Sequence, residues 1–364
     1  MLIEAGGVDL HIKSDSPIRA RFKNDIVLLS KEVIESENIK LLIKLLTGTS
    51  YGKFLEEKEF DGAYSLDRKH RFRVNIYMHF NGYAIVFRLI PPTIKTIEEL
   101  NLPKQMHKLV HLKRGLVLIT GTTGSGKSTT LASIIEEINQ TYNRHIITIE
   151  DPVEYMYHDR KSIIEQRQVG LHTNSFSNAL RAAMREDPDI IVVGEIRDLA
   201  TAESILNAVN TGHLVFSTTH TLDARETIDR IISLFPTEEQ NRVRTTLAST
   251  LEAVISQRLI KGVTQEMIPA VEIMFKTPMI KELIRAKRDR EIPDIIKKEG
   301  MIGSITFNQA LFNLALAGKI TEDQAYEYAT SPADLKVMFT MSPEYENRRK
   351  RRKHHSGKEV WLKE

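Results

Sequence analysis

The sequence predicts an α/β protein in which a parallel sheet is covered by helices on both faces. Short, mostly apolar segments alternate with longer segments whose apolar residues recur at helical spacing, and such alternation is typical of this fold class. The apolar segments are 115–120, 145–149, 190–193 and 213–219, and the helical segments lie near 127–138, 175–186, 199–210 and 223–234. In the first helical segment, Leu131, Ile134, Ile135 and Ile138 fall on one face of the expected helix.

Length and composition bound the alternatives. The chain has 364 residues, 41% hydrophobic and 27% charged, which suits about two or three domains with packed cores. With 51 Lys and Arg against 48 Asp and Glu, overall charge gives no argument for nucleic acid or an anionic membrane. The absence of cysteine excludes disulfides, thiolate metal sites and cysteine nucleophiles. With no long apolar run and no basic N-terminal region, we expect a cytoplasmic protein.

The first ninety residues predict an α+β domain. Residues 31–46 have apolar residues at helical spacing, so we expect a helix there. Segments 72–80 and 83–90 are rich in β-branched and aromatic residues and are separated by Asn81-Gly82. An Asn-Gly pair between two such segments is a strong signal for a β-hairpin.

Changes in composition divide the chain into five regions. We expect an α+β domain at 1–90, a proline-marked linker with a short helix at 91–112, the α/β domain at 113–264, a helical region at 265–340 and a basic tail at 341–364. Within the helical region, 278–289 and 306–318 have helical patterns. The tail contains RRKRRK and little apolar content, which favours a disordered, solvated extension.

A phosphate-binding loop is predicted at GTTGSGKS, residues 121–128, which matches G-x-x-x-x-G-K-[ST] between an apolar strand and a helix. The glycines let the backbone curl so that N–H groups point at phosphate oxygens, and the helix N-terminus adds partial positive charge. The lysine can reach the β- and γ-phosphates, and the serine hydroxyl can join a Mg²⁺ ion. The expected ATP-binding residues are Gly121, Thr122, Thr123, Gly124, Ser125, Gly126, Lys127, Ser128 and Thr129.

Acidic and histidine side chains follow the other predicted strands. Glu150-Asp151 follows one strand, Glu195 the next, and His220 the last. Because ligands of parallel sheets bind beyond the carboxyl ends of the strands, we expect these groups to face one crevice. Either carboxylate of the Glu150-Asp151 pair could orient or deprotonate a water molecule. His213 lies at the other end of its strand, where a capping role is the alternative.

The ordered set of motifs resembles the secretion ATPases of the type II secretion and type IV pilus superfamily. That family carries a Walker A loop, an Asp box, a Walker B segment and a His box in this order. The corresponding segments here are GTTGSGKSTT (121–130), ITIEDPVEY (147–155), LRAAMREDPDIIVVGEIRD (180–198) and TGHLVFSTTHT (211–221). The resemblance covers about 1–340 and includes VDLHI (8–12) and RFRVNIY (71–77) near the N-terminus.

The resemblance implies a PAS-like N-terminal domain, a RecA-like ATPase domain, a helical C-terminal region and a ring-shaped hexamer that hydrolyses ATP with Mg²⁺. By the same resemblance, Ser128 and Glu195 hold Mg²⁺, Glu195 partly through water, and Glu150 is the catalytic base. His220 and His213 are expected near the phosphates.

The resemblance also gives a role to arginines of the N-terminal domain. Arg71, Arg73 and Arg88 would reach the γ-phosphate as the ring closes, where a guanidinium neutralises transition-state charge. From the residues alone, a solvated strand face is the alternative. The implied partner is a pilus platform protein of the inner membrane, with no nucleic acid.

Within the superfamily, the chain is most similar to the pilus retraction motors, because it lacks the tetracysteine zinc insertion of extension and type II secretion motors. Retraction motors carry AIRNLIRE in the C-terminal region, whereas residues 279–286 here read MIKELIRA. The alternatives are an accessory retraction ATPase, a pilus-extension or type II secretion motor, and a DNA translocase that uses the basic residues 348–353.

Overall fold

The computed structural model describes residues 2–22, 25–67, 69–298 and 300–345. The chain forms two compact units, one built mainly from residues up to Ile94 and the other mainly from Lys95 onward. Within the described ranges, no helix is both long enough and apolar enough to cross a bilayer. The RRKRRK segment and most of the expected tail lie outside the described residues.

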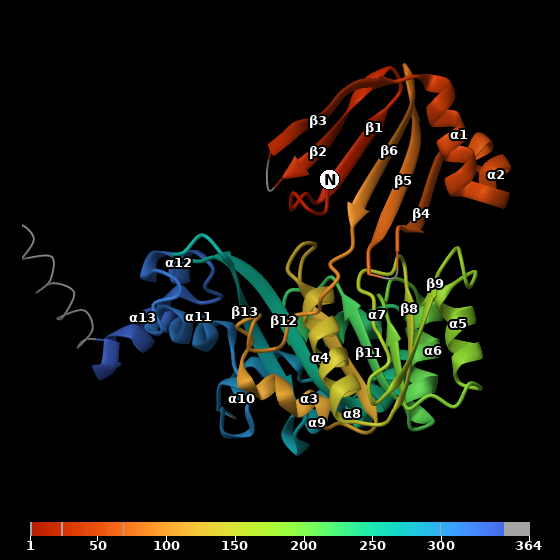
Figure 1. The fold of residues 1–364 in the computed structure, drawn as a ribbon. Coiled ribbons are helices and arrows are strands. Elements are labelled where there is room, and N and C mark those ends of the chain that lie inside the picture. The colour runs from red at the N-terminus through yellow and green to blue at the C-terminus, as the bar shows by residue number, and fades with distance from the viewer. Residues whose placement is uncertain (1, 23–24, 68, 299, 346–364) are drawn as a thin grey trace, which may run out of the picture. The chain divides into compact units, whose positions relative to one another are not determined.

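The first unit is a six-stranded antiparallel sheet with two helices (Figure 1). The strand order is β3-β2-β1-β6-β5-β4. The elements are β1 (Asp9–Lys13), β2 (Ser16–Phe22), β3 (Asp25–Ile34), α1 (Ser36–Thr47), α2 (Tyr51–Glu57), β4 (Glu59–Ser65), β5 (Arg71–His79) and β6 (Gly82–Leu89). Ile39 and Ile43 of α1 and Phe54 of α2 pack with Ile76 and Ile85 of the sheet in one buried cluster. This arrangement is the α+β domain expected at the N-terminus.

The sequence located the β5–β6 hairpin correctly but extended the first helix too far. His79 pairs with Gly82, so Asn81 lies in the tight turn. The helix expected from residue 31 begins at Ser36, because residues up to Ile34 belong to β3 and pair with β2. Pairing between strands therefore overrides the local helical spacing.

The second unit contains a seven-stranded sheet in the order β13-β12-β7-β11-β10-β8-β9. Its strands are β7 (Gly115–Thr120), β8 (His145–Glu150), β9 (Ile163–Gln168), β10 (Ile190–Val193), β11 (Leu214–Thr219), β12 (Leu251–Lys261) and β13 (Met267–Phe275). The pairs β8–β10, β10–β11, β11–β7 and β7–β12 are parallel. All residues of β7, β10 and β11 are buried, as strands covered on both faces require.

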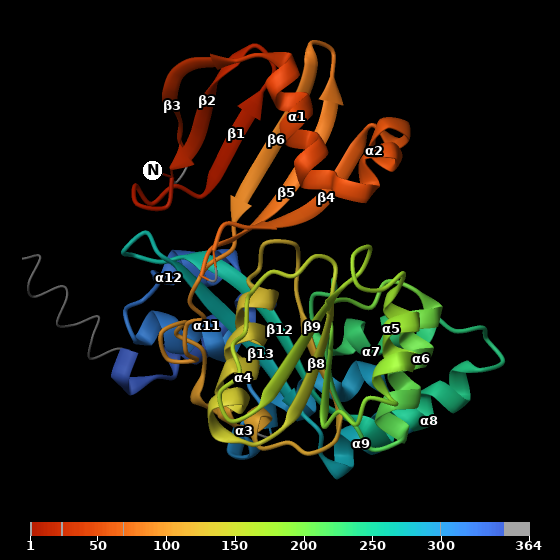
Figure 2. The same ribbon diagram turned by 45° about the vertical axis from the view of Figure 1, so that its right-hand side comes forward.

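The helices of this unit follow the alternation that the sequence predicts. They are α3 (His107–Val110), α4 (Lys127–Thr141), α5 (Phe176–Ala183), α6 (Leu199–Asn210), α7 (Ala224–Ser233), α8 (Gln240–Thr250), α9 (Pro278–Arg285), α10 (Ile292–Lys298), α11 (Phe307–Leu316), α12 (Glu322–Glu327) and α13 (Pro332–Thr340). The chain passes from β7 through α4 to β8 and then returns through α5 and α6 to β10 and β11. Since such crossovers are right-handed, α4 covers one face and α5 and α6 the other (Figure 2).

Two expectations for the C-terminal half need correction. The sheet is mixed rather than parallel throughout, because β13 pairs antiparallel with β12. The region expected to be helical from residue 265 therefore opens with a strand, Met267–Phe275. The sequence also predicts a short helix within residues 91–104 of the linker, but residues 97–101 form turns and helical structure begins at Lys104.

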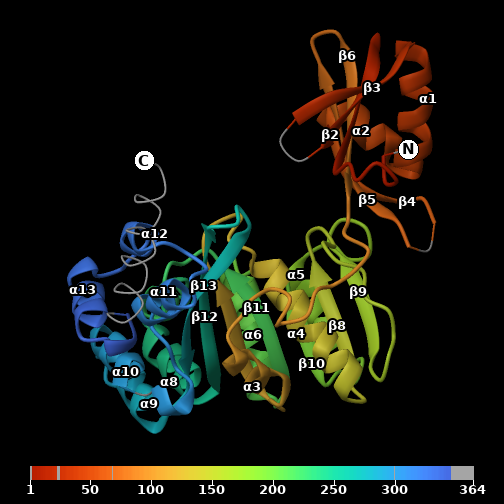
Figure 3. The same ribbon diagram turned by 60° about the vertical axis from the view of Figure 1, so that its left-hand side comes forward.

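The last helices pack on the long β12–β13 pair (Figure 3). Ile260 and Ile268 of the strands contact Leu311, Leu335 and Phe339 in one buried cluster. This apolar cluster attaches the C-terminal helices to the sheet that carries the phosphate loop.

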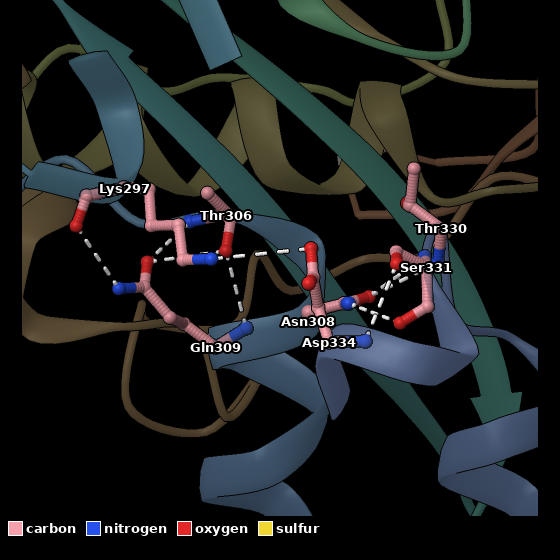
Figure 4. A network of polar contacts seen from close by, with 7 residues as sticks. All are labelled: Lys297, Thr306, Asn308, Gln309, Thr330, Ser331 and Asp334. Atoms are coloured by element: carbon pink, nitrogen blue, oxygen red, sulfur yellow. Dashed lines mark hydrogen bonds and ion pairs between the residues drawn. The ribbon is translucent and has the colours of Figure 1, made fainter. Parts of the chain in front are cut away.

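A polar network orders the same helices (Figure 4). Thr306 and Gln309 form a capping box at the start of α11. The Asn308 side chain donates to the Ser331 carbonyl at 2.7 Å and accepts from the Thr330 N–H at 3.0 Å. Ser331 in turn caps α13, so one buried amide holds the start of α13 against α11.

Glu272 of β13 is a buried carboxyl group between two helix starts. Its Oε1 accepts from the Ala224 N–H at 3.1 Å, and it also accepts from the Phe307 N–H, so it binds the first residues of α7 and α11. Burial, with a smaller contribution from Asp223, raises the pKa of Glu272 from 4.5 to about 7, although the two N–H groups and Arg258 oppose this.

We predict that Glu272→Gln removes a pH dependence of stability. Between pH 4.5 and about 7, folded Glu272 keeps a proton that the unfolded chain has lost. Its stabilising contribution is therefore complete below pH 4.5 and lost as pH rises through about 7. As pH rises across this range, the free energy of unfolding of the variant should exceed that of the wild type by an amount that grows to on the order of 3 kcal/mol. Thermal melts at several pH values would measure this difference. The exposed-site variant Glu238→Gln is the control, and parallel curves for Glu272→Gln and the wild type would contradict the assignment.

Candidate nucleotide-binding site

The phosphate loop joins the buried strand β7 to the start of α4. Gly121, Gly124 and Gly126 have φ values of 142°, 78° and 88°, which side chains with a Cβ rarely adopt. A Cβ on Gly121 would also lie 2.4 Å from the Gln257 carbonyl oxygen, whereas one on Gly124 would meet nothing within 4 Å. The loop thus packs closely against the protein on one side and is open on the other. This curled, open backbone fits a phosphate group.

Lys127 places its ammonium group over the loop. Nζ donates to the carbonyls of Gly121 and Thr122 at 2.9 and 3.0 Å and lies 3.4 Å from His220 Nδ1. The residue is 8% exposed. A largely buried cation beside a glycine-rich turn is suited to binding an anion.

His220 connects Lys127 to Glu195. His220 Nε2 lies 3.0 Å from Glu195 Oε1, and Arg197 Nε donates to Glu195 Oε2 at 2.8 Å. Because the lysine ammonium can only donate, His220 Nδ1 accepts and Nε2–H donates to the carboxylate. The imidazole thus lies between a cation and an anion, and side chains from three of the four motifs form one chain of contacts.

Glu150 ends β8 next to this chain of contacts. Its Oε1 accepts from the Thr148 hydroxyl at 2.6 Å and from the Gln166 amide at 3.1 Å. Val193 of β10 pairs with Ile149, so Glu150 and Glu195 leave neighbouring parallel strands at the same edge. Asp151, the other candidate for a base, is exposed.

His213 lies elsewhere. Its Nδ1 lies 3.0 Å from the Ala208 carbonyl oxygen and 3.0 Å from Thr211 Oγ1, at the end of α6. It precedes β11, whereas His220 follows β11. The structure therefore places His213 at the opposite edge of the sheet from the phosphate loop of the same chain, where it contacts the end of α6.

The three candidate arginines belong to the first unit. Arg73 pairs with Arg88 across β5 and β6. Arg88 donates from Nε and Nη2 to Asp9 at 2.8 and 3.2 Å, which raises the pKa of Arg88. Arg71 donates to Ser65 at 3.0 Å. Arg73 and Arg88 thus share one strand-to-strand row with the buried carboxylate of Asp9.

Sequence reasoning missed several residues that support the site. Gln257 bonds to the phosphate loop, Arg197 to Glu195, and Thr148 and Gln166 to Glu150. Gln257 could have been noticed, because Ser256, Gln257 and Arg258 interrupt the apolar residues of this strand. The other residues have no local pattern that distinguishes them from surface polar residues.

The fold and this site define a P-loop ATPase with a RecA-like core. Residues 2–291 match the type II/IV secretion system protein family, and the chain belongs to it. The expected family and fold class are therefore confirmed.

Relatives of this chain include ATPases of type IV pili. The chain is 41% identical to the type IV pilus retraction ATPase PilT of Pseudomonas aeruginosa over 331 residues, 91% of this chain and 96% of that protein. It is 35% identical to the type IV pilus ATPase PilU of the same species over 346 residues, 94% and 91% of the two chains. The crystal structure of the pilus retraction motor PilT with bound ADP matches with a TM-score of 0.85 and 40% identity, over 92% of this chain and 96% of that one.

We predict that Lys127→Ala abolishes ATP turnover and leaves the fold intact. The substitution removes the ammonium group of the phosphate loop, while the apolar face of α4 stays unchanged. Steady-state ATPase assays and circular dichroism would measure the two effects. Lys108→Ala is a matched control, because Lys108 also donates to a backbone carbonyl, that of Ile302, but outside the loop. Wild-type turnover in Lys127→Ala would contradict the site.

Proposed function

We propose that this chain is a hexameric ATPase motor that drives retraction of type IV pili, and hence twitching motility. The observation that carries the proposal is the contact chain from Lys127 through His220 to Glu195 beside the phosphate loop, in a chain with these relatives. ATP hydrolysis at this edge of the sheet supplies the energy. The motor acts at the inner face of the cytoplasmic membrane through a platform protein of the pilus.

Ser128 and Glu195 are the residues that would hold Mg²⁺. A hydroxyl and a carboxylate are the hard oxygen donors that this ion prefers. Ser128 follows the loop lysine directly, and Glu195 is linked to that lysine through His220. No group of three or more metal-ligating side chains exists among the described residues, and P-loop sites need none, since phosphate oxygens and water complete the coordination. When bound, the ion neutralises charge on the β- and γ-phosphates.

Glu150 is the proposed general base. Thr148 and Gln166 both donate to Oε1 and thereby fix the orientation of the carboxylate. A fixed carboxylate beside the γ-phosphate position can orient a water molecule and accept its proton. His220, which donates to Glu195, would report the presence of the γ-phosphate to that carboxylate.

Arg71, Arg73 and Arg88 are the proposed cations that complete the site as the ring closes. Arg73 is half exposed and 3.9 Å from its nearest acid, Asp61, so little holds it in place. Its guanidinium is thus available to a phosphate.

An accessory retraction motor is the second candidate, because the match to PilU covers nearly the whole chain. The two functions predict different phenotypes when the gene is deleted. Loss of a principal retraction motor should leave excess pili that do not retract, whereas loss of an accessory motor should leave retraction in place.

We predict that a deletion strain bears excess, non-retracting pili. Fluorescently labelled pili would be imaged in the deletion strain and after complementation with the wild type or Lys127→Ala. Only the wild type should restore retraction. Cells without pili would indicate an extension motor, and normal retraction would indicate an accessory role.

We predict that substitutions of the two glutamates have different effects on ATP binding and on turnover. Glu195→Gln should weaken Mg²⁺-dependent nucleotide binding as well as turnover. Glu150→Gln should keep ATP binding and slow hydrolysis by about a hundredfold or more. Equilibrium binding of a fluorescent ATP analogue, with and without Mg²⁺, and single-turnover hydrolysis would measure both.

One control variant and one further test extend this comparison. Glu154→Gln removes a carboxylate from the same motif beyond the strand end. Mixed rings with Glu150→Gln in one subunit and Arg73→Ala in another test whether base and arginine serve one site. Equal loss of ATP affinity in both glutamate variants, or near-normal turnover in Glu150→Gln, would overturn the assignment.

A further inference from the structure

Gln257 is a buried side chain that binds the phosphate loop from the neighbouring strand. It lies on β12, which pairs in parallel with β7, the strand that leads into the loop. The residue is 3% exposed. A buried amide must satisfy its donor and its acceptor inside the protein.

The donor and the acceptor of the Gln257 amide both have partners, one in the phosphate loop and one in the helix that follows it. Nε2 donates to the Ser125 carbonyl at 2.7 Å, within the loop, and Oε1 accepts from the Thr130 hydroxyl at 2.7 Å, in the first turn of α4. These bonds connect the loop to the helix that follows it. They also fix the orientation of the amide, since Ser125 O can only accept.

The phosphate loop also packs closely against Gln257. A Cβ on Gly121 would lie 2.4 Å from the Gln257 carbonyl oxygen, and a Cβ on Gly126 would lie 2.8 Å from Gln257 Nε2. Two of the three loop glycines therefore permit close contact with Gln257, besides their positive φ values. The contact at Gly121 involves the backbone of residue 257, whereas the contact at Gly126 involves the Gln257 side chain.

We propose that Gln257 is a positioning residue that holds the phosphate loop in its nucleotide-binding conformation and thereby sets nucleotide affinity. The inference rests on the proposed function, because it assumes that the loop binds ADP and ATP. Gln257 acts through the loop backbone, which contacts the phosphates in the ground state and the transition state alike. Its loss therefore weakens nucleotide binding equally in the ground state and the transition state. The Michaelis constant should then change more than the turnover number.

The test is Gln257→Met, which keeps the shape of the side chain and removes both hydrogen bonds. We expect the ADP dissociation constant and the KM for ATP to rise about tenfold or more, while kcat at saturating ATP changes less than about threefold. Gln257→Glu keeps the acceptor for Thr130 but points a carboxylate at the Ser125 carbonyl, so its affinity should fall at least as far.

The neighbouring residue supplies a matched control. Arg258 donates to the Tyr328 carbonyl at 2.7 Å and stacks on Phe307, in the C-terminal region. Arg258→Met also removes a side-chain bond to a backbone carbonyl from this strand. It should lower the melting temperature and leave ADP affinity unchanged, which separates general destabilisation from loss of loop positioning.

A double-mutant cycle with Thr130→Val tests the direct coupling. Because both side chains share one hydrogen bond, the effects of Gln257→Met and Thr130→Val on ADP affinity should be clearly less than additive. Wild-type ADP affinity in Gln257→Met, or additive effects in the cycle, would overturn the inference alone. Absence of ADP binding by the wild type would instead overturn the proposed function.

Discussion

The parallel pairing of β8, β10, β11, β7 and β12 is the constraint on which the site depends. It brings the carboxyl ends of β7, β8, β10 and β11 to one edge, where the residues at and beyond those ends form the site, and it places Gln257 of β12 beside the phosphate loop. A slip of strands that are buried along their whole length would disrupt the close packing on both of their faces. Glu150, Glu195, His220 and the phosphate loop therefore owe their proximity to packing far from any phosphate.

Charged side chains at the carboxyl edge of the parallel strands are paired with one another. One chain of contacts runs from the ammonium of Lys127 through the imidazole of His220 to the carboxylate of Glu195 and the guanidinium of Arg197. A buried ammonium or carboxylate without partners would be costly. A phosphate bound at Lys127 would replace part of this pairing, and His220 links Lys127 to Glu195.

Local signals in the sequence were sufficient for much of this architecture. The Asn81-Gly82 turn, the glycine-rich loop and the apolar strands each depend on residues close together in the chain. The errors share another cause. Residues up to Ile34 entered β3 because β2 pairs with them, and β13 replaced an expected helix because β12 pairs with it. The Asp9–Arg88 pair joins residues 79 apart and has no local pattern.

The β12–β13 pair also explains how the nucleotide site and the C-terminal helices belong to one mechanical unit. Successive side chains of a strand point to opposite faces, and here Gln257 binds the phosphate loop while Arg258 binds the C-terminal region. On β13, Glu272 pairs with Ser256 and binds the starts of α7 and α11. The starts of α7, which follows the His box, and of α11 are thus bound to one carboxyl group. A densely packed strand pair transmits displacement rather than absorbing it, so a change in the phosphate loop must move these helices or be resisted by them.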